Sequence, residues 1–273
     1  MTPRVSVVST VYNGERYFDR AVPDILNQTY QDFEFVVVDD GSDDRTPELL
    51  REVALKDPRV RVFSPGRLGA ATAYNYGVAQ ARGEYIARQD FDDRSYPERL
   101  RLQVERLDAE PKLGVVGGYY VLADESRGER YVRMPPLEHD QIVRAMARYI
   151  PLAHTVATFR RRAWEQAGGY PVAANLIDLR FWLQVIKDGW RFANVPELIG
   201  EHYVHWDSYF FRSLDYVGRQ RDLARVQAQI IRELRLPRWM YVYPIGRYGY
   251  AHFPQGLKRV LRRSLGGSSE RDV

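Results

Sequence analysis

The sequence predicts an α/β fold with a mostly parallel central sheet, helices on both of its faces and a helical extension at the C-terminus. Short β-branched segments alternate with segments of helical periodicity over the first 110 residues, as in sheets built from strand–helix units. Polar clusters stand directly after these apolar segments, where ligands bind to such sheets. With 45% hydrophobic residues among 273, the chain can build a full core, which excludes a disordered protein.

The strand–helix alternation runs through the first half of the chain. Strands are predicted over residues 4–11, 33–38, 60–63 and 84–89, and helices over residues 47–56 and 69–81. Another helix should follow the first strand with Asn13 as its N-cap, and Pro23 within its pattern predicts a kink or a late start. Ser95 to Glu98 has the form of a capping box, so a further helix should begin there.

The second half is less regular in its pattern. A strand is predicted over residues 113–122, and helices over residues 140–148, 161–167, 178–187 and 211–234. The chain therefore divides into a unit of residues 1–210, with halves 1–110 and 111–210, and an extension of residues 211–273.

Composition and apolar patterning exclude several classes of protein. The chain has no cysteine, which excludes disulfides, thiolate zinc sites and cysteine nucleophiles and is consistent with a reducing compartment. The first residues lack the cationic and apolar regions of a secretory signal, and the apolar stretch 113–123 is far short of the ~20 residues that span a bilayer. We therefore expect a cytoplasmic protein, which can still lie on the inner face of the membrane.

Three carboxylates stand together after the fourth predicted strand, at Asp90, Asp92 and Asp93. They repel one another unless a cation sits among them, and a hard divalent ion takes one or two carboxylates together with phosphate oxygens. This pattern predicts a metal site. The alternative is a solvated acidic loop or an acidic helix N-terminus.

A second acidic pair, Asp39 and Asp40, follows the second predicted strand. One of the two can accept hydrogen bonds from a nucleotide base or ribose, or the pair can cap the turn that Gly41 and Ser42 complete. The turn at residues 66–69 can help to hold a diphosphate at the following helix N-terminus, although it lacks the form of a P-loop.

Several of these segments, in this order and spacing, resemble family 2 glycosyltransferases. The matching blocks are VSVVSTVYNG at 5–14, LNQTY at 26–30, VVVDDGS at 36–42, GEYIARQDFDD at 83–93 and PERL at 97–100. The resemblance implies a Rossmann-like glycosyltransferase-A fold whose catalytic domain is residues 1–210, with a nucleotide-sugar-binding half and an acceptor-binding half. It implies an inverting, hexosyltransferase-type enzyme that uses a nucleotide-diphosphate sugar and Mn²⁺ or Mg²⁺, as in polysaccharide biosynthesis.

The resemblance also implies residue roles. Tyr12 and Asp39 fall where the family holds the nucleobase and ribose, and Asp92 and Asp93 fall on its Asp-x-Asp-type motif. The family often has Asn where this chain has Arg67, which is a departure from the pattern. The predicted donor-binding set is Thr10, Tyr12, Asp39, Asp40, Arg67 and Asp92, and the predicted metal set is Asp90, Asp92, Asp93 and His205.

The catalytic base is expected in the second half. Family members carry Gly-Gly-Tyr, a short loop and Glu-Asp before an apolar helix with Trp. Here Asp178 takes the base position, while Ile177 replaces the usual Glu and Arg180 replaces a residue that is usually acidic. One carboxylate within reach of the acceptor hydroxyl is enough for general-base catalysis. The alternative is that Asp178 only caps its helix.

Two histidines and a tryptophan complete the predicted site. His154 matches a family histidine that can line the acceptor pocket, together with Trp182, although a lone histidine is more often a structural group. His205 sits where relatives carry a histidine that approaches the metal or diphosphate, and His202 competes with it for this role.

The C-terminal segment 234–267 is basic and aromatic. It holds seven of the cationic residues and no acidic one, although the whole chain has a net charge of only +4. This composition fits the surface of an anionic membrane, which suits a lipid-linked acceptor, or else a packed subdomain with a solvated basic face. The sequence contains no recognised nucleic-acid-binding module beside these basic residues, so their charge does not predict nucleic-acid binding.

Two other functions compete with glycosyl transfer. A nucleotidyltransferase would need a Gly-rich cationic loop after the first strand, and the chain has no cation there before Arg16. A sugar-nucleotide-binding scaffold that has lost catalysis is consistent with Ile177.

Overall fold

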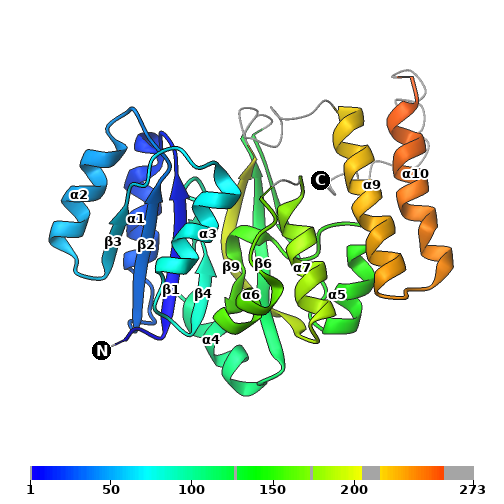
Figure 1. Ribbon diagram of the computed structural model, residues 1–273, viewed down its shortest axis with the longest axis horizontal. Helices are drawn as coiled ribbons and strands as arrows, with labels where there is room; N and C mark the ends of the chain where they lie inside the picture. Colours follow the sequence, from blue (N-terminus) through cyan, green and yellow to red (C-terminus); the bar gives the residue numbers. More distant parts are fainter. Residues whose placement is uncertain (1, 126–127, 173–174, 205–215, 255–273) are drawn as a thin grey trace.

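The computed structural model describes residues 2–125, 128–172, 175–204 and 216–254. Within these residues one sheet runs in the order β3-β2-β1-β4-β8-β6-β9-β5, and β7 pairs with β6 outside this path (Figure 1). The sheet is mostly parallel, as predicted, and is continuous across the two predicted halves of the catalytic unit.

The first half of the sheet is parallel throughout. Its strands are β1 (Val5–Val11), β2 (Phe33–Asp39), β3 (Val60–Phe63) and β4 (Tyr85–Arg88). In β1, Val8 pairs with Val36 on one side and Arg88 on the other. Because both faces are covered, β2 is buried along its whole length, which explains its continuous apolar sequence.

The second half of the sheet contains strands that the periodicity did not predict. They are β5 (Arg94–Ser95), β7 (Glu129–Arg133), β8 (Thr158–Arg160) and β9 (Arg191–Val204), beside the predicted β6 (Leu113–Asp124). β6 and β9 are parallel, whereas β5, β7 and β8 are antiparallel to their neighbours. The pairing of β9 shifts register around Pro196 and Glu197, and this irregularity breaks the alternation that would have identified the strand.

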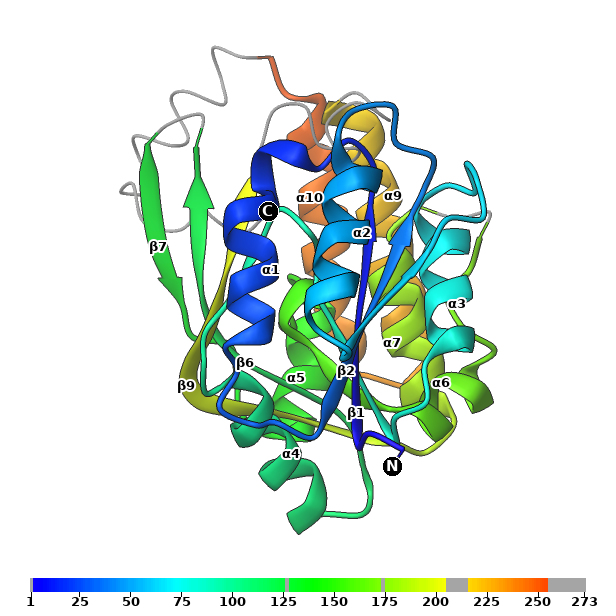
Figure 2. The ribbon, with the colours of Figure 1, turned by 90° about the vertical axis from the view of Figure 1, so that its left-hand side faces the viewer.

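Helices cover both faces of the sheet, as predicted (Figure 2). One face packs against α1 (Phe18–Leu26), α2 (Thr46–Lys56) and α4 (Arg99–Ala109). The other face packs against α3 (Ala70–Gln80), α5 (His139–Met146), α6 (Arg161–Ala167), α7 (Ile177–Lys187) and α9 (Tyr216–Glu233). Outside α9 lie a 3-10 turn, η3 (Arg238–Tyr241), and α10 (Val242–His252). No helix of the described residues combines the length and apolarity that a bilayer crossing requires.

Two predicted helix starts are wrong. Asn13 has a positive φ of 54° and exchanges hydrogen bonds with Asp43, so it does not cap a helix. A 3-10 turn, η1 (Glu15–Tyr17), follows it, and α1 starts at Phe18, so Pro23 lies inside this helix and does not mark its start. Ser95 belongs to β5, and its hydroxyl accepts a hydrogen bond from the Arg99 side chain instead of capping α4.

Candidate functional site

The predicted donor-binding residues lie together beyond the carboxyl ends of β1 and β2. Tyr12 is 48% exposed, and the guanidinium carbon of Arg67 lies 3.6 Å from its ring centroid. Arg67 also reaches Asp40, with 3.3 Å between Nη1 and Oδ2 and a hydrogen bond to the backbone oxygen. Thr10, near the end of β1, pairs with Val38 of β2. The arrangement forms an open aromatic surface with a cation stacked on it.

The two aspartates after β2 have different roles in the local structure. The carboxylate of Asp40 accepts the backbone N–H groups of Leu68 and Gly69, at 2.6 and 3.1 Å. Asp39 accepts the N–H of Ser42, at 3.0 Å, and is buried at the end of its strand. These two amides of the 66–69 turn are therefore engaged by Asp40, and the predicted contact of that turn with a diphosphate would have to use other groups.

The acidic cluster after β4 is partly neutralised by neighbouring cations. Arg88 holds Asp90, with its Nε and Nη2 at 3.0 and 2.8 Å from Oδ1. Asp93 is 1% exposed and accepts hydrogen bonds from His202 Nδ1 (2.9 Å) and the backbone N–H of Tyr203 (2.7 Å). The second of these contacts joins the loop after β4 to the end of β9.

Asp92 lies beside the two other carboxylates of this cluster. Burial, together with the charges of Asp93 and Asp90, raises the pKa of Asp92 to about 7. Burial alone would lower the pKa of His202, but the three carboxylates, Asp93 foremost, outweigh it and raise that pKa to about 9. His202 is therefore an imidazolium at neutral pH, and its charge offsets part of the acidic cluster.

His202, the competitor of His205, is the histidine that lies in this cluster. His205 falls outside the described residues, so its predicted role stays a prediction. In the described part of the chain, no three or more acidic or histidine side chains form a group arranged to hold a metal ion. Both oxygens of Asp93 are hydrogen-bonded, and one oxygen of Asp90 is bound to Arg88. The carboxylates of Asp90, Asp92 and Asp93 fit an ion that also takes phosphate oxygens as ligands, as Mg²⁺ and Mn²⁺ do.

Two arginines to which the sequence analysis assigned no role support the acidic loop. Arg99 is fully buried and donates to the side chain of Gln89 (2.7 Å) and the backbone oxygen of Arg88 (2.5 Å). Burial lowers its pKa to about 10. Arg20, from α1, donates to the backbone oxygen of Asp92 and stacks on Tyr203 with 4.0 Å to the ring centroid.

Asp178 stands in the first turn of α7, after Leu176 in the left-handed conformation. Burial raises its pKa, and backbone hydrogen bonds and the charge of Arg88 lower it less. The charges of Arg88 and Asp90 also act on it, Arg88 lowering and Asp90 raising its pKa. A carboxyl group with a raised pKa is better matched to proton abstraction near neutral pH than an ordinary aspartate.

His154 and Trp182 lie behind Arg88. His154 Nε2 is 2.8 Å from the hydroxyl of Tyr170 and 3.3 Å from Nη1 of Arg88. Burial and the charge of Arg88 lower the pKa of His154 well below its usual value, so the ring is neutral. Trp182 is 1% exposed and packs on His154 with 5.2 Å between ring centroids. Its burial indicates that it supports His154, and its predicted contact with an acceptor stays a prediction.

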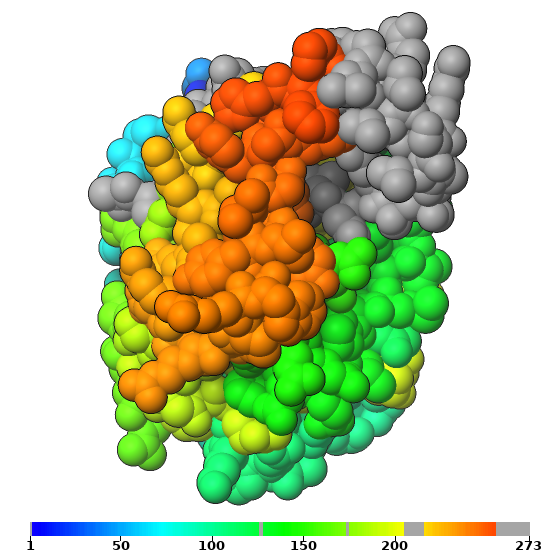
Figure 3. All heavy atoms as spheres, turned by 90° about the vertical axis from the view of Figure 1, so that its right-hand side faces the viewer, coloured from blue at the N-terminus to red at the C-terminus, as the bar shows by residue number. Residues whose placement is uncertain are grey.

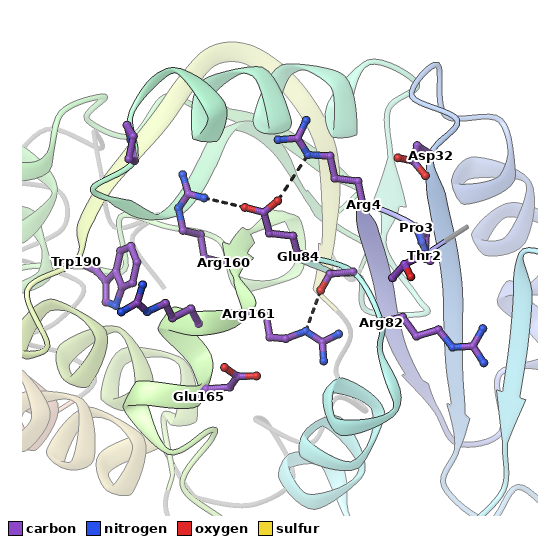
Figure 4. Close-up of a pocket in the computed structure, with 13 residues that line it drawn as sticks. Thr2, Pro3, Arg4, Asp32, Arg82, Glu84, Arg160, Arg161, Glu165 and Trp190 are labelled. Atoms are coloured by element: carbon purple, nitrogen blue, oxygen red, sulfur yellow. Dashed lines mark hydrogen bonds and ion pairs between the residues drawn. The ribbon is translucent and has the colours of Figure 1, made fainter.

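A separate hollow of about 790 Å³ lies at the opposite edge of the sheet, at the amino ends of β1 and β4 (Figure 4). Glu84 there pairs with Arg160 and Arg4, at 3.3 and 3.8 Å, and Arg161 donates to the backbone oxygen of Gly83. The lining holds more arginines than carboxylates: Arg4, Arg82, Arg160, Arg161 and Arg162 against Asp32, Glu84 and Glu165. None of the predicted site residues lines this hollow.

The sequence matches known families and proteins. The family model described as Glycosyl transferase family 2 matches residues 6–168. EpsE of Bacillus subtilis (strain 168), which carries a glycosyltransferase name, is 31% identical over 275 residues, covering 97% of each chain. The chondroitin synthase of Pasteurella multocida (strain Pm70) is 29% identical over 78% of this chain but only 22% of its own length.

Solved structures share the fold at low sequence identity. The mannosyltransferase PcManGT from Pyrobaculum calidifontis, in complex with GDP-Man and Mn²⁺, has a TM-score of 0.66 and 22% identity, covering 97% of this chain and 80% of its own. TarS residues 1–349 from S. aureus, in complex with UDP-GlcNAc, has a TM-score of 0.66 and 18% identity, covering 98% and 77%.

Proposed function

The chain belongs to glycosyl transferase family 2, and we propose that this enzyme moves a sugar from a nucleotide-diphosphate donor to an acceptor hydroxyl with inversion, using Asp178 as general base. The observation that carries the proposal is the position of Asp178. It stands in the first turn of α7, burial raises its pKa, and the charges of Arg88 and Asp90 act on it. These features support Asp178 as the proton acceptor.

The donor is proposed to bind over the ends of β1 and β2. The half-exposed ring of Tyr12 offers a stacking surface for the nucleobase, and Asp39 offers carboxylate oxygens to the ribose. The guanidinium of Arg67 lies over the Tyr12 ring, so a nucleobase would either displace this guanidinium or bind beneath it. Thr10 and Asp40 would complete this side of the site. The structural neighbours were solved with GDP-Man and UDP-GlcNAc, which supports a nucleotide-sugar donor and leaves the base and sugar to experiment.

A divalent ion, Mn²⁺ or Mg²⁺, fits the acidic loop when it is shared with the donor diphosphate. Asp92 would hold it, with Asp93 beside it and His205 as a further candidate ligand. The bound ion would supply positive charge against the negative charge that develops on the diphosphate. The crowding that raises the pKa of Asp92 is the reason why a cation suits this loop. A structural neighbour carries Mn²⁺ in its complex.

In the transfer step, the proton would be handled by a group of this chain. Asp178 would take the proton from the acceptor hydroxyl as its oxygen attacks the anomeric carbon from the face opposite the diphosphate. His154 and Tyr170 hold Arg88, which in turn holds Asp90, so these residues would keep the charges around Asp178 in place. A saccharide or a lipid-linked saccharide is the proposed acceptor.

The first experiment is a thermal-shift panel of nucleotide diphosphates and sugar nucleotides, each with and without Mn²⁺. A ligand of the folded state raises the melting temperature with the logarithm of its concentration over its dissociation constant. We expect a shift with one nucleotide base, increased by Mn²⁺ and lost in Asp93→Ala. If no sugar nucleotide shifts the protein, the proposed donor site is wrong.

The second experiment tests catalysis by itself. Asp178→Asn should keep the donor-induced shift and lose sugar transfer or donor hydrolysis by roughly 10²- to 10⁴-fold. Asp188→Asn, at the other end of α7, is the matched control and should keep full activity. Donor binding without any transfer by the wild-type protein would favour the scaffold alternative that Ile177 suggests.

A further inference from the structure

The outer face of η3 and α10 carries large apolar side chains that no other part of the described chain covers. Trp239, Val242 and Ile245 are 65%, 59% and 68% exposed. They follow one another at spacings of three residues, and Gly246, with no side chain, stands beside them. In the view of Figure 3 these elements form the outermost layer on this side of the molecule. We define Trp239, Val242, Ile245, Arg235 and Arg238 as the η3–α10 face.

The charge on this face has one sign. Arg235 and Arg238 are exposed, and no acidic residue stands between Glu233 and the end of the described chain at residue 254. Glu233 itself is paired with Lys187, at 2.8 Å. Arg247 is turned inward, because it donates to the side chain of Gln220 and the backbone oxygen of Arg148, at 2.8 Å each. Arg235 and Arg238 are therefore the exposed arginines that accompany the apolar side chains of this face.

We propose that the η3–α10 face binds the surface of a lipid bilayer that carries anionic headgroups. Apolar and aromatic side chains flanked by arginine suit the boundary between headgroups and acyl chains, where a helix lies in the plane of the interface. A second copy of this chain fits the face poorly, because a symmetric contact would bring Arg235 and Arg238 against the same cations with no carboxylate between them.

The position of the face links membrane binding to the candidate site. α10 packs on α9, and α9 shares a buried core with α7, whose first turn contains Asp178. A bilayer at this face would therefore lie on the α7 side of the molecule and would favour an acceptor carried on a lipid. The preference for a lipid-carried acceptor rests on the proposed function, whereas membrane binding does not.

Vesicle flotation with the full-length protein tests the inference. Vesicles are made of equal parts phosphatidylglycerol and phosphatidylcholine, or of phosphatidylcholine alone. We expect binding to the anionic vesicles that weakens with added salt. Trp239→Ala combined with Ile245→Ser should weaken it at least tenfold, and Arg235→Gln combined with Arg238→Gln should weaken it about fivefold per cation, the factor that corresponds to ~1 kcal/mol.

Matched controls come from α2, which lies at the far side of the molecule in Figure 1. Leu55 is 89% exposed there, and Arg51 is exposed on the same helix. Leu55→Ser and Arg51→Gln should bind vesicles like the wild type. Equal binding by all variants, or no binding, would overturn the inference. Self-association that Trp239→Ala abolishes would assign the face to a second copy instead. The sugar-nucleotide thermal shift of the same variants should not change, so this inference and the proposed function can fail independently.

Discussion

The carboxylate of Asp93, in the loop after β4, is bound by His202, near the end of β9, with 2.9 Å between Oδ2 and Nδ1. The two residues are 109 positions apart in the sequence. The backbone N–H of Tyr203 donates to the other oxygen of the same carboxylate. The nucleotide-side loop is thereby tied to the second half of the sheet by one ion pair and one backbone hydrogen bond.

This pair should make stability depend on pH. The folded-state pKa of His202, about 9, is raised above the ordinary value of 6.5. The stabilisation is therefore fully present below pH 6.5 and is lost as the pH rises through 9. Because the histidine side chain is 40% exposed, solvent screening limits the effect to about 1 kcal/mol. The wild type should exceed His202→Gln in free energy of unfolding by that amount near pH 6 and by less above pH 9, measured by urea denaturation.

His139 offers a comparison of opposite sign. Burial, followed by the charge of Arg191, lowers its pKa below 6.5. Its contribution should be present above pH 6.5 and should be lost as the pH falls, so the difference between the wild type and His139→Gln should shrink in acid.

For His202, a difference between the wild type and His202→Gln that does not change with pH would show that the imidazole acts by packing alone.

Arg99 should be the most costly arginine to replace in α4. It is fully buried and its hydrogen-bond partners are neutral oxygens, so Arg99→Met leaves the side chain of Gln89 and the backbone oxygen of Arg88 without their donor. The expected loss is on the order of 2–4 kcal/mol in free energy of unfolding. Arg101→Met, on the same helix, removes only exposed pairs with Glu98 and Glu105 and should cost much less. Similar losses for the two variants would contradict this account.

Gly200 should tolerate no side chain. A Cβ at this position would overlap the backbone oxygen of Arg94, across the β5–β9 pairing. Because β5 starts directly after Asp93, Gly200→Ala should both destabilise the protein, by ~1–3 kcal/mol, and weaken Mn²⁺-dependent donor binding in the thermal-shift assay. Gly246→Ala is the control. Nothing lies within 4 Å of its added Cβ, and alanine favours a helix, so its melting temperature should not fall.

The sequence predicted the elements whose patterns are local. β1 to β4 and most of the helices came from apolar periodicity, because they are buried on regular faces. β9 could not be found in this way. Its pairing with β6 changes register around Pro196 and Glu197, so its regularity exists only against its partner strand. The capping box failed for a similar reason, since Ser95 is engaged by Arg99 in a buried polar network.

The placement of Asp39 at the end of β2 and of Asp93 in the loop after β4 was predictable from the polar residues that follow apolar segments. The supporting cations were not, because Arg20 and Arg99 look like ordinary helix residues in the sequence and acquire their roles through tertiary contacts. His202 was considered only as the competitor of His205. Its importance follows from the approach of β9 to the loop after β4, and the pattern gave no sign of that pairing.

Asp178 should determine the acid side of the activity profile. A general base works when it is ionised, and burial raises the pKa of this carboxyl above its ordinary value of 3.8. The kcat/KM for sugar transfer should therefore rise with pH through a midpoint above 3.8. Asp178→Glu should keep a pH-dependent activity with lower kcat, because a carboxylate remains near the acceptor. If Asp178→Asn kept the same acid limb and rate as the wild type, the proton would be taken by another group, and the assignment of Asp178 as the base would be wrong.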